Sequence, residues 1–154
     1  MTIVDLIQAM LAPGIMISAC GLLLLGMNNK YSLVVNRIRL LDDEKRKLKG
    51  TYTKSIVEEN RFNSIQLQLI KFGYRIKMVR NAVISYSLAV GFFIMTCLAI
   101  GLRFSLEDKG GAAFALILFL AGMISVFFGV LFAVIEVIKG YEIVQIEIKQ
   151  DNQE

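Results

Sequence analysis

Three long runs of apolar residues alternate with polar segments along the chain. They cover residues 7–27, 82–102 and 112–138, and none has a charged residue near its centre. A helix rises about 1.5 Å per residue, so about 20 residues cross a hydrocarbon layer about 30 Å thick. Each run is long enough, and the sequence therefore predicts three transmembrane helices in a single membrane domain.

A regular, mostly apolar stripe begins at the end of the first run and continues through the polar segment that follows. Its members follow one another at alternating steps of three and four, the heptad spacing that places residues on one side of a helix. They are Leu24, Met27, Tyr31, Val34, Ile38, Leu41, Lys45 and Leu48. No helix breaker separates this stripe from the first run. We therefore expect one helix to cross the membrane and to continue until Gly50 ends it.

A second stripe with the same spacing leads into the second apolar run. It consists of Phe62, Ile65, Leu69, Phe72, Ile76, Val79 and Val83. Because the two stripes match in period and run in opposite directions, residues 28–81 are predicted to form a long antiparallel, coiled-coil-like helical hairpin. The conformation at its tip, residues 50–61, stays open. A weaker stripe of Leu67, Ile70 and Tyr74 needs a further cover, either the C-terminal tail or another subunit.

The third apolar run carries a small residue at every fourth position. These residues are Ala121, Ser125, Gly129 and Ala133. Such a ridge lets helix backbones approach closely in lipid, where hydrophobicity alone gives no attraction between helices. The ridge predicts a tight helix interface, with a partner either in the same chain or in a neighbouring one.

The tail, residues 139–154, continues the heptad spacing of the third run through Tyr141 and Val144 to Ile148. This spacing favours a helix that extends beyond the membrane, although the alternation from Val144 through Ile146 to Ile148 would also fit a strand. The predicted fold is an all-α integral membrane protein with three transmembrane helices, in which the third extends into the cytoplasm.

The distribution of charge predicts the topology. Residues 28–81 hold 13 Lys and Arg against 5 Asp and Glu, whereas the segment 103–111 holds two charges of each sign. Basic loops are retained in the cytoplasm, so the hairpin and the C-terminus are expected inside and the N-terminus outside. The positive charges indicate anionic lipid headgroups at the cytoplasmic face, and not nucleic acid, as partners. Candidate headgroup or interface residues are Lys30, Arg37, Arg39, Lys77 and Arg80.

Few residues suggest chemistry. The chain has no His, its two Cys lie in apolar runs, and it lacks a phosphate-binding glycine loop or a catalytic Ser, acid and base set. We therefore expect neither an enzyme nor a bound cofactor or metal. Glu136 is the one acid at a membrane boundary. It is expected to pair with Lys139 or with a lysine of the hairpin.

The chain resembles a bacterial membrane-protein family known as domain of unknown function number 2721. The resemblance rests on Ala12, Pro13, Leu22 to Leu25, Asn29, Lys30, Tyr31, Asn36, Arg37, Ile38, Arg39 and Leu41, and it continues through Arg75, Arg80 and Ala82. The chain departs from the pattern at Lys30, where arginine is expected, at Leu33, often basic, and at Asn36, often aspartate. The resemblance implies a compact multi-span protein of the bacterial inner membrane and supplies no activity.

Two functions fit these patterns. The first is a homo-oligomeric structural or regulatory membrane protein whose hairpin offers a docking surface in the cytoplasm, because the apolar stripes outnumber their partners within one chain. The second is an oligomeric channel or pore, lined by the first transmembrane helix and selecting anions through the basic hairpins. Its candidate pore-lining or helix-contact residues are Gln8, Ser18, Asn28 and Asn29.

Overall fold

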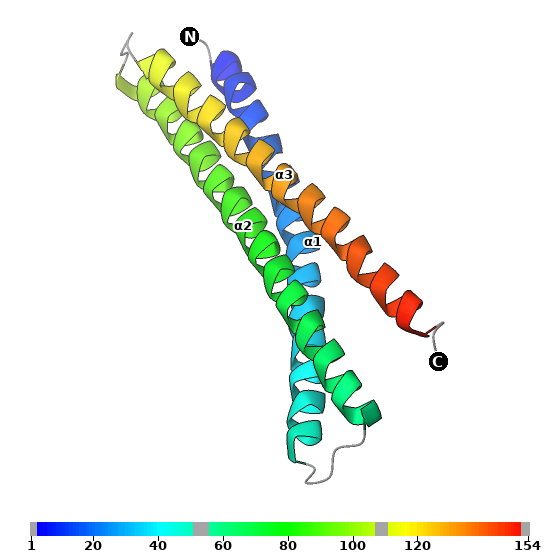
Figure 1. Ribbon diagram of the computed structural model, residues 1–154. Helices are drawn as coiled ribbons and strands as arrows, with labels where there is room; N and C mark the ends of the chain where they lie inside the picture. The colour runs from blue at the N-terminus through cyan, green and yellow to red at the C-terminus, as the bar shows by residue number, and fades with distance from the viewer. Residues whose placement is uncertain (1–2, 51–55, 107–110, 152–154) are drawn as a thin grey trace. The chain divides into compact units, whose positions relative to one another are not determined.

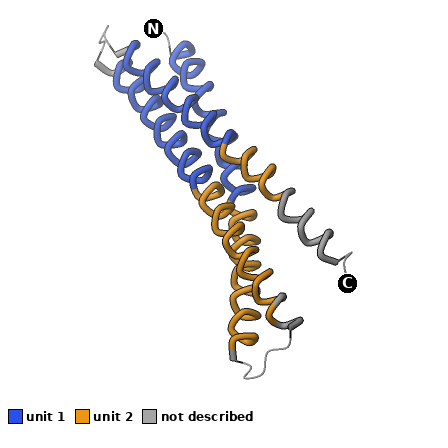
Figure 2. The backbone as a smooth tube through the Cα atoms, viewed as in Figure 1, with its two compact units in different colours: residues 1–27, 81–131 blue, residues 28–80, 132–154 orange. Residues whose placement is uncertain are grey.

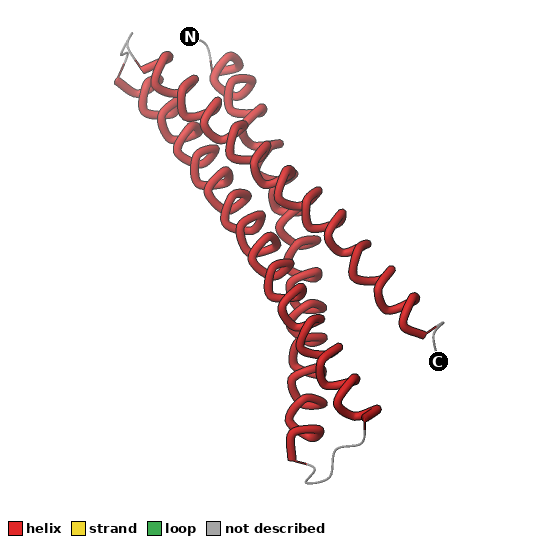
Figure 3. The backbone as a smooth tube through the Cα atoms, viewed as in Figure 1, coloured by secondary structure: helices red, strands yellow, loops and turns green. Residues whose placement is uncertain are grey.

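The computed structural model describes the backbone of residues 3–50, 56–106 and 111–151, and these residues form three helices (Figures 1 and 3). Helix α1 is Ile3–Gly50, α2 is Ile56–Leu106 and α3 is Gly111–Asp151. No strand occurs in the three described ranges. The all-helical prediction is thus confirmed, and the strand alternative for residues 144–148 is wrong.

Each helix contains a window long and apolar enough to cross a membrane. In lipid a spanning segment must satisfy its own backbone hydrogen bonds, which a helix does and an isolated strand does not. At most 22% of the residues in any of these windows are buried within the chain. The apolar side chains that remain exposed suit contact with lipid, and the chain is a membrane protein.

Helix α1 continues past Pro13 and ends at Gly50, the residue expected to end it. Glycine is a poor helix former and is common just beyond the last turn of a helix. The sequence also favours a turn at Thr51 to Lys54 and a capping residue at Ser55 for the next helix, and these residues lie outside the described part of the chain. Helix α2 includes residues 56–61, so this part of the hairpin tip is helical.

The chain divides into two compact units (Figure 2). Unit 1 comprises residues 1–27 and 81–131, and unit 2 comprises residues 28–80 and 132–154. Unit 1 therefore contains most of the apolar runs, and unit 2 contains most of the charged residues.

Burial along α1 follows the heptad through both the apolar run and the polar segment. Its buried residues are Pro13, Cys20, Met27, Val34 and Leu41, which are seven residues apart throughout. A straight α-helix drifts by only about 20° over seven residues, so these side chains form one slowly turning stripe along α1. The face predicted from Leu24 onwards thus begins further upstream, at Pro13.

The core of unit 1 combines side chains from all three helices. Cys20 of α1 packs with Ala89 and Phe93 of α2, and Phe119 of α3 joins this cluster. The Phe93 and Phe119 ring centroids are 5.6 Å apart with the rings tilted. Such a tilted arrangement adds a small attraction to the area that the two rings bury.

The core of unit 2 joins the two heptad stripes. Val34 and Leu41 of α1 are buried against Ile65 and Phe72 of α2. The partly buried residues packed against them are Ile38, Leu48, Leu69 and Ile76, which also belong to the two stripes. The predicted stripes are therefore the residues through which α1 and α2 pack in unit 2.

Candidate functional site

The polar residues that the sequence suggested for a pore or for helix contacts all lie on α1. Gln8, Ser18, Asn28 and Asn29 are all exposed along α1. The Ser18 hydroxyl donates to the Gly14 carbonyl oxygen of its own helix at 3.5 Å.

The small residues of α3 contact α2 within unit 1. The Ser125 hydroxyl donates to the Ser85 carbonyl oxygen at 2.8 Å. Gly129 is buried, and a Cβ atom there would lie 2.6 Å from Cε1 of Tyr86. This part of the ridge therefore has its partner in the same chain. Ala121 and Ala133 are half-buried.

Gly122, which sequence reasoning missed, makes an equally close approach. A Cβ atom there would lie 2.7 Å from Cε1 of Phe93. The buried residues of α3 are Ala115, Gly122, Gly129, Glu136 and Gly140, of which the first four are seven residues apart. The contact face of α3 thus follows a seven-residue spacing. The predicted ridge, with its four-residue spacing, shares only Gly129 with this face.

Five basic residues were candidates for headgroup contact. Arg37, Arg39, Lys77 and Arg80 are exposed in unit 2. Lys30 differs, because its amino group pairs with a buried carboxylate. The other four suit a surface role, whereas Lys30 belongs to a cluster inside unit 2.

Glu136 is the centre of this cluster. Its side chain is only 2% exposed. The Arg75 guanidinium donates to Oε1 from Nη2 at 2.6 Å and from Nε at 3.2 Å. The Lys30 Nζ donates to Oε2 at 3.1 Å. We call these three residues the Glu136 cluster. One of its partners is a lysine of the hairpin, as expected, and the other is an arginine that was not.

The cluster joins the three helices within unit 2. Lys30 comes from α1, Arg75 from α2 and Glu136 from α3. The Arg75 side chain is 19% exposed and that of Lys30 is 43% exposed. Arg75 also lies 5.6 Å from the centroid of the Phe72 ring, a favourable cation–π contact. Of the three charged groups, those of Glu136 and Arg75 are therefore mostly shielded from solvent, and that of Lys30 is not.

Gly140 provides the space for the Arg75 guanidinium. It lies one turn after Glu136 on α3, and a Cβ atom there would be 3.0 Å from Arg75 Nη2. A side chain at this position would crowd the charged group. The glycine thus lets the arginine lie against α3 and reach the carboxylate.

A carboxylate with two cations carries a net charge of one positive unit. A buried carboxylate is stable only when its lost hydration is replaced by charged hydrogen bonds, and Glu136 accepts three. An open groove of about 420 Å³ adjoins the cluster, lined also by Leu33, Val34 and Val137. The arrangement can fasten helices together or hold a small anion beside Lys30. No group of metal-binding His, Cys, Asp or Glu occurs among the described residues.

The sequence contained part of the signal for this cluster. Glu136 stood out as the acid in an apolar run, and Gly140 follows at the spacing of one turn. Arg75 carried no such signal, because 61 residues separate it from Glu136. Local periodicity identifies the face of a helix but not a distant ionic partner.

Three long apolar helices and a buried ionic cluster define a helical membrane protein. The family whose sequence model matches residues 10–146 is described as "Protein of unknown function (DUF2721)", and the chain belongs to this family. The resemblance noted from Ala12 to Ala82 is thereby confirmed. No curated protein and no solved structure matches the sequence.

Proposed function

We propose that the protein is a homo-oligomeric structural or regulatory membrane protein that assembles through its helical hairpin. In this proposal the hairpin is coiled-coil-like and lies in the cytoplasm. It presents a docking surface either to further copies of the chain or to a partner protein. The proposal assigns no catalytic activity to the chain.

The observation that carries the proposal is an apolar stripe left uncovered in unit 2. Leu67, Ile70 and Tyr74 are 49%, 66% and 47% exposed. They lie on one side of α2, whereas Ile65 and Phe72 on the other side pack against α1. A contiguous exposed apolar stripe outside a membrane marks an interaction surface. A second copy is favoured because most soluble and many membrane assemblies are symmetric homo-oligomers.

The stripe should be needed for self-association. We expect the purified protein to be oligomeric in a mild detergent by native mass spectrometry. The double variant Leu67→Ser with Ile70→Ser should lower the population of oligomer by about tenfold or more, because each substitution removes roughly 1.5 kcal/mol or more of apolar burial at the interface.

A matched control substitutes exposed polar residues of the same helix, Glu59→Ser with Gln66→Ser, and should leave the oligomer unchanged. Circular dichroism should show equal helix content in all variants. A strictly monomeric parent protein, or equal loss in both double variants, would contradict the proposal.

The pore hypothesis has less support from the contacts. Ser18 uses its hydroxyl on Gly14, and its exposed neighbours on the same side, Ile15 and Leu22, are apolar. A polar path would need more such groups, since isolated polar residues in membrane helices commonly serve helix contacts. If lipid bilayers that contain the protein at high density carry no ionic current, the pore hypothesis is wrong.

The proposed topology places the hairpin on the cytoplasmic side of a bacterial inner membrane, on the basis of the basic residues in 28–81. It can be tested with single cysteines at Asp5→Cys and Lys49→Cys, after replacing Cys20 and Cys97 by alanine. On intact spheroplasts an impermeant maleimide should label the first position, and the second should react only after lysis. Labelling of the second position before lysis would reverse the topology.

A further inference from the structure

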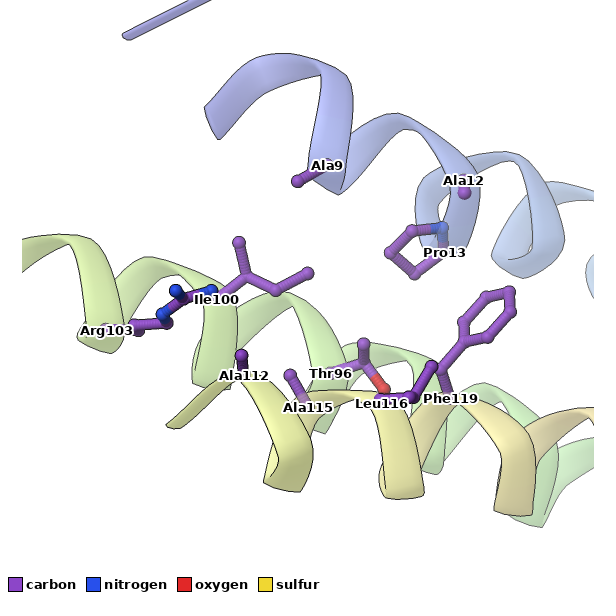
Figure 4. A pocket seen from close by; sticks show the side chains of 10 residues that line it. All are labelled: Ala9, Ala12, Pro13, Thr96, Ile100, Arg103, Ala112, Ala115, Leu116 and Phe119. Atoms are coloured by element: carbon purple, nitrogen blue, oxygen red, sulfur yellow. The ribbon is translucent and has the colours of Figure 1, made fainter. Parts of the chain in front are cut away.

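Unit 1 contains an apolar cleft between its three helical segments, close to the C-terminal end of α2 (Figure 4). Figure 4 shows Ala9, Ala12 and Pro13 of α1 on one side of it, facing side chains of α2 and α3 on the other. The volume is about 260 Å³. Binding sites for whole drug-sized ligands measure roughly 300–1,000 Å³, so this cleft suits part of a molecule, such as one chain.

The cleft exists because small residues line it where helices meet. Ala9 and Ala12 of α1 face Ala112 and Ala115 of α3 across it. Larger residues at these four positions would fill the space. The alanines therefore leave a space between the helices here. At Gly122 and Gly129 of α3, by contrast, rings of α2 contact the helix directly.

The interior offers no free polar group to a polar ligand. Its hydroxyl, that of Thr96, donates to the Phe92 carbonyl oxygen at 2.8 Å. Phe119 and Pro13 add a ring on either side. An apolar guest is favoured in such a lining, because burying a polar group without a partner costs free energy.

Among the described residues, Arg103 is the charged one that lines the cleft, and it lies at one end. Arg103 is in the last turn of α2, and Figure 4 shows it at one end of the lining residues with Phe119 at the other. A guanidinium presents several donors and pairs well with phosphate. The described lining is thus apolar along its length and cationic at one end.

We propose that this cleft binds one acyl chain of an anionic phospholipid, with the lipid phosphate on Arg103. The chain lies among the alanines, Pro13 and Phe119, and the headgroup remains at the membrane surface. Phospholipid is the source favoured by location, because the cleft belongs to helices that face lipid. This site is separate from the basic residues of unit 2 and does not depend on the proposed oligomer.

The absence of tryptophan makes the site measurable. Leu116→Trp places the only indole at the cleft, and Phe114→Trp places it two residues away on the same helix but outside the cleft. Leu116 and Phe114 are equally exposed, at 58% and 57%. The two positions differ in depth by only about 3 Å along the helix. If lipids brominated in an acyl chain quench the indole at position 116 more than the indole at position 114, the difference is therefore due to the cleft and not to depth in the membrane.

We expect brominated phosphatidylglycerol to associate with the indole at position 116 about two- to fivefold more tightly than brominated phosphatidylcholine, the range for one partly exposed ion pair. The indole at position 114 should show no preference. Arg103→Gln should abolish the preference at position 116. Equal quenching by the two lipids, or a preference that survives Arg103→Gln, would overturn the proposal.

A second variant tests the acyl chain apart from the headgroup. Ala12→Leu fills the cleft from an exposed position of α1 and should lower quenching by both lipids at position 116. Ala113→Leu adds the same volume outside the cleft and should not. If Ala12→Leu has no effect, or if only a free brominated fatty acid and no phospholipid quenches position 116 preferentially, the phospholipid assignment is wrong.

Discussion

Glu136→Leu is expected to destabilise the protein by about 3–5 kcal/mol, the cost of removing one partner from a buried ionic pair. The substitution leaves the mostly buried Arg75 guanidinium without the carboxylate that accepts its two hydrogen bonds. The loss is an uncompensated charge and not a cavity, since leucine has a similar volume. Unfolding in mixed micelles with dodecyl sulfate, followed by circular dichroism, measures it.

The loss of stability on substituting a member of the Glu136 cluster should depend on how deeply the charged group left behind, or removed, is buried. Lys30 is 43% exposed and can turn its amino group to water, so Lys30→Leu should cost only about 0–1 kcal/mol. The double variant Arg75→Leu with Glu136→Leu should recover much of the stability, because an apolar pair replaces the ionic one. Additive losses in this double variant would mean that the two residues do not act as a pair.

The Glu136 cluster links the three helices of unit 2 through charged hydrogen bonds. Glu136 accepts three charged hydrogen bonds, two from Arg75 and one from Lys30. The exposed part of the cluster is Lys30, which borders the groove. Glu136 itself also lines this groove, although its side chain is only 2% exposed. Any ligand there would meet the lysine before the acid.

The helices themselves were predictable because their signals are local. Neighbouring residues alone reveal the length of an apolar run, the heptad from Met27 to Leu41 and the expected stop at Gly50. In unit 2, α1 and α2 pack through the two predicted heptad stripes. The helical tail, which continues α3 to Asp151, was confirmed, and its signal was also local. The exposure of Ile70 agrees with the expectation that its stripe lacks a partner in the hairpin.

The contact face of α3 was predicted less well, for a geometric reason. Four residues of a helix turn through about 400°, so a ridge of every fourth residue rotates by about 40° at each step, whereas a seven-residue repeat rotates by about 20° in the opposite direction. Over a long helix only the heptad stays on one face. Gly122 and Gly129 keep this spacing, while Ala121 and Ala133 lie to the side of it and are half-buried.

This geometry leads to the second large expected effect. Gly122→Ala and Gly129→Ala should each cost about 1–3 kcal/mol, because the new methyl groups would overlap the rings of Phe93 and Tyr86, which are fully buried and have little room to move. The sites are about 10 Å apart along α3, so the losses should add to about 2–6 kcal/mol in the double variant. The same micelle titration measures both.

Two other glycines separate overlap from helix propensity. A Cβ atom at Gly91 or Gly101 of α2 would meet nothing within 4 Å. Alanine is the better helix former by about 1 kcal/mol, so Gly91→Ala and Gly101→Ala should be neutral or stabilising. Trimming the opposing ring with Phe93→Leu should make Gly122→Ala less costly than it is in the parent protein. If Gly122→Ala is as harmless as Gly91→Ala, then close contact between α2 and α3 does not stabilise unit 1, and the small residues of α3 must serve an interface with another chain.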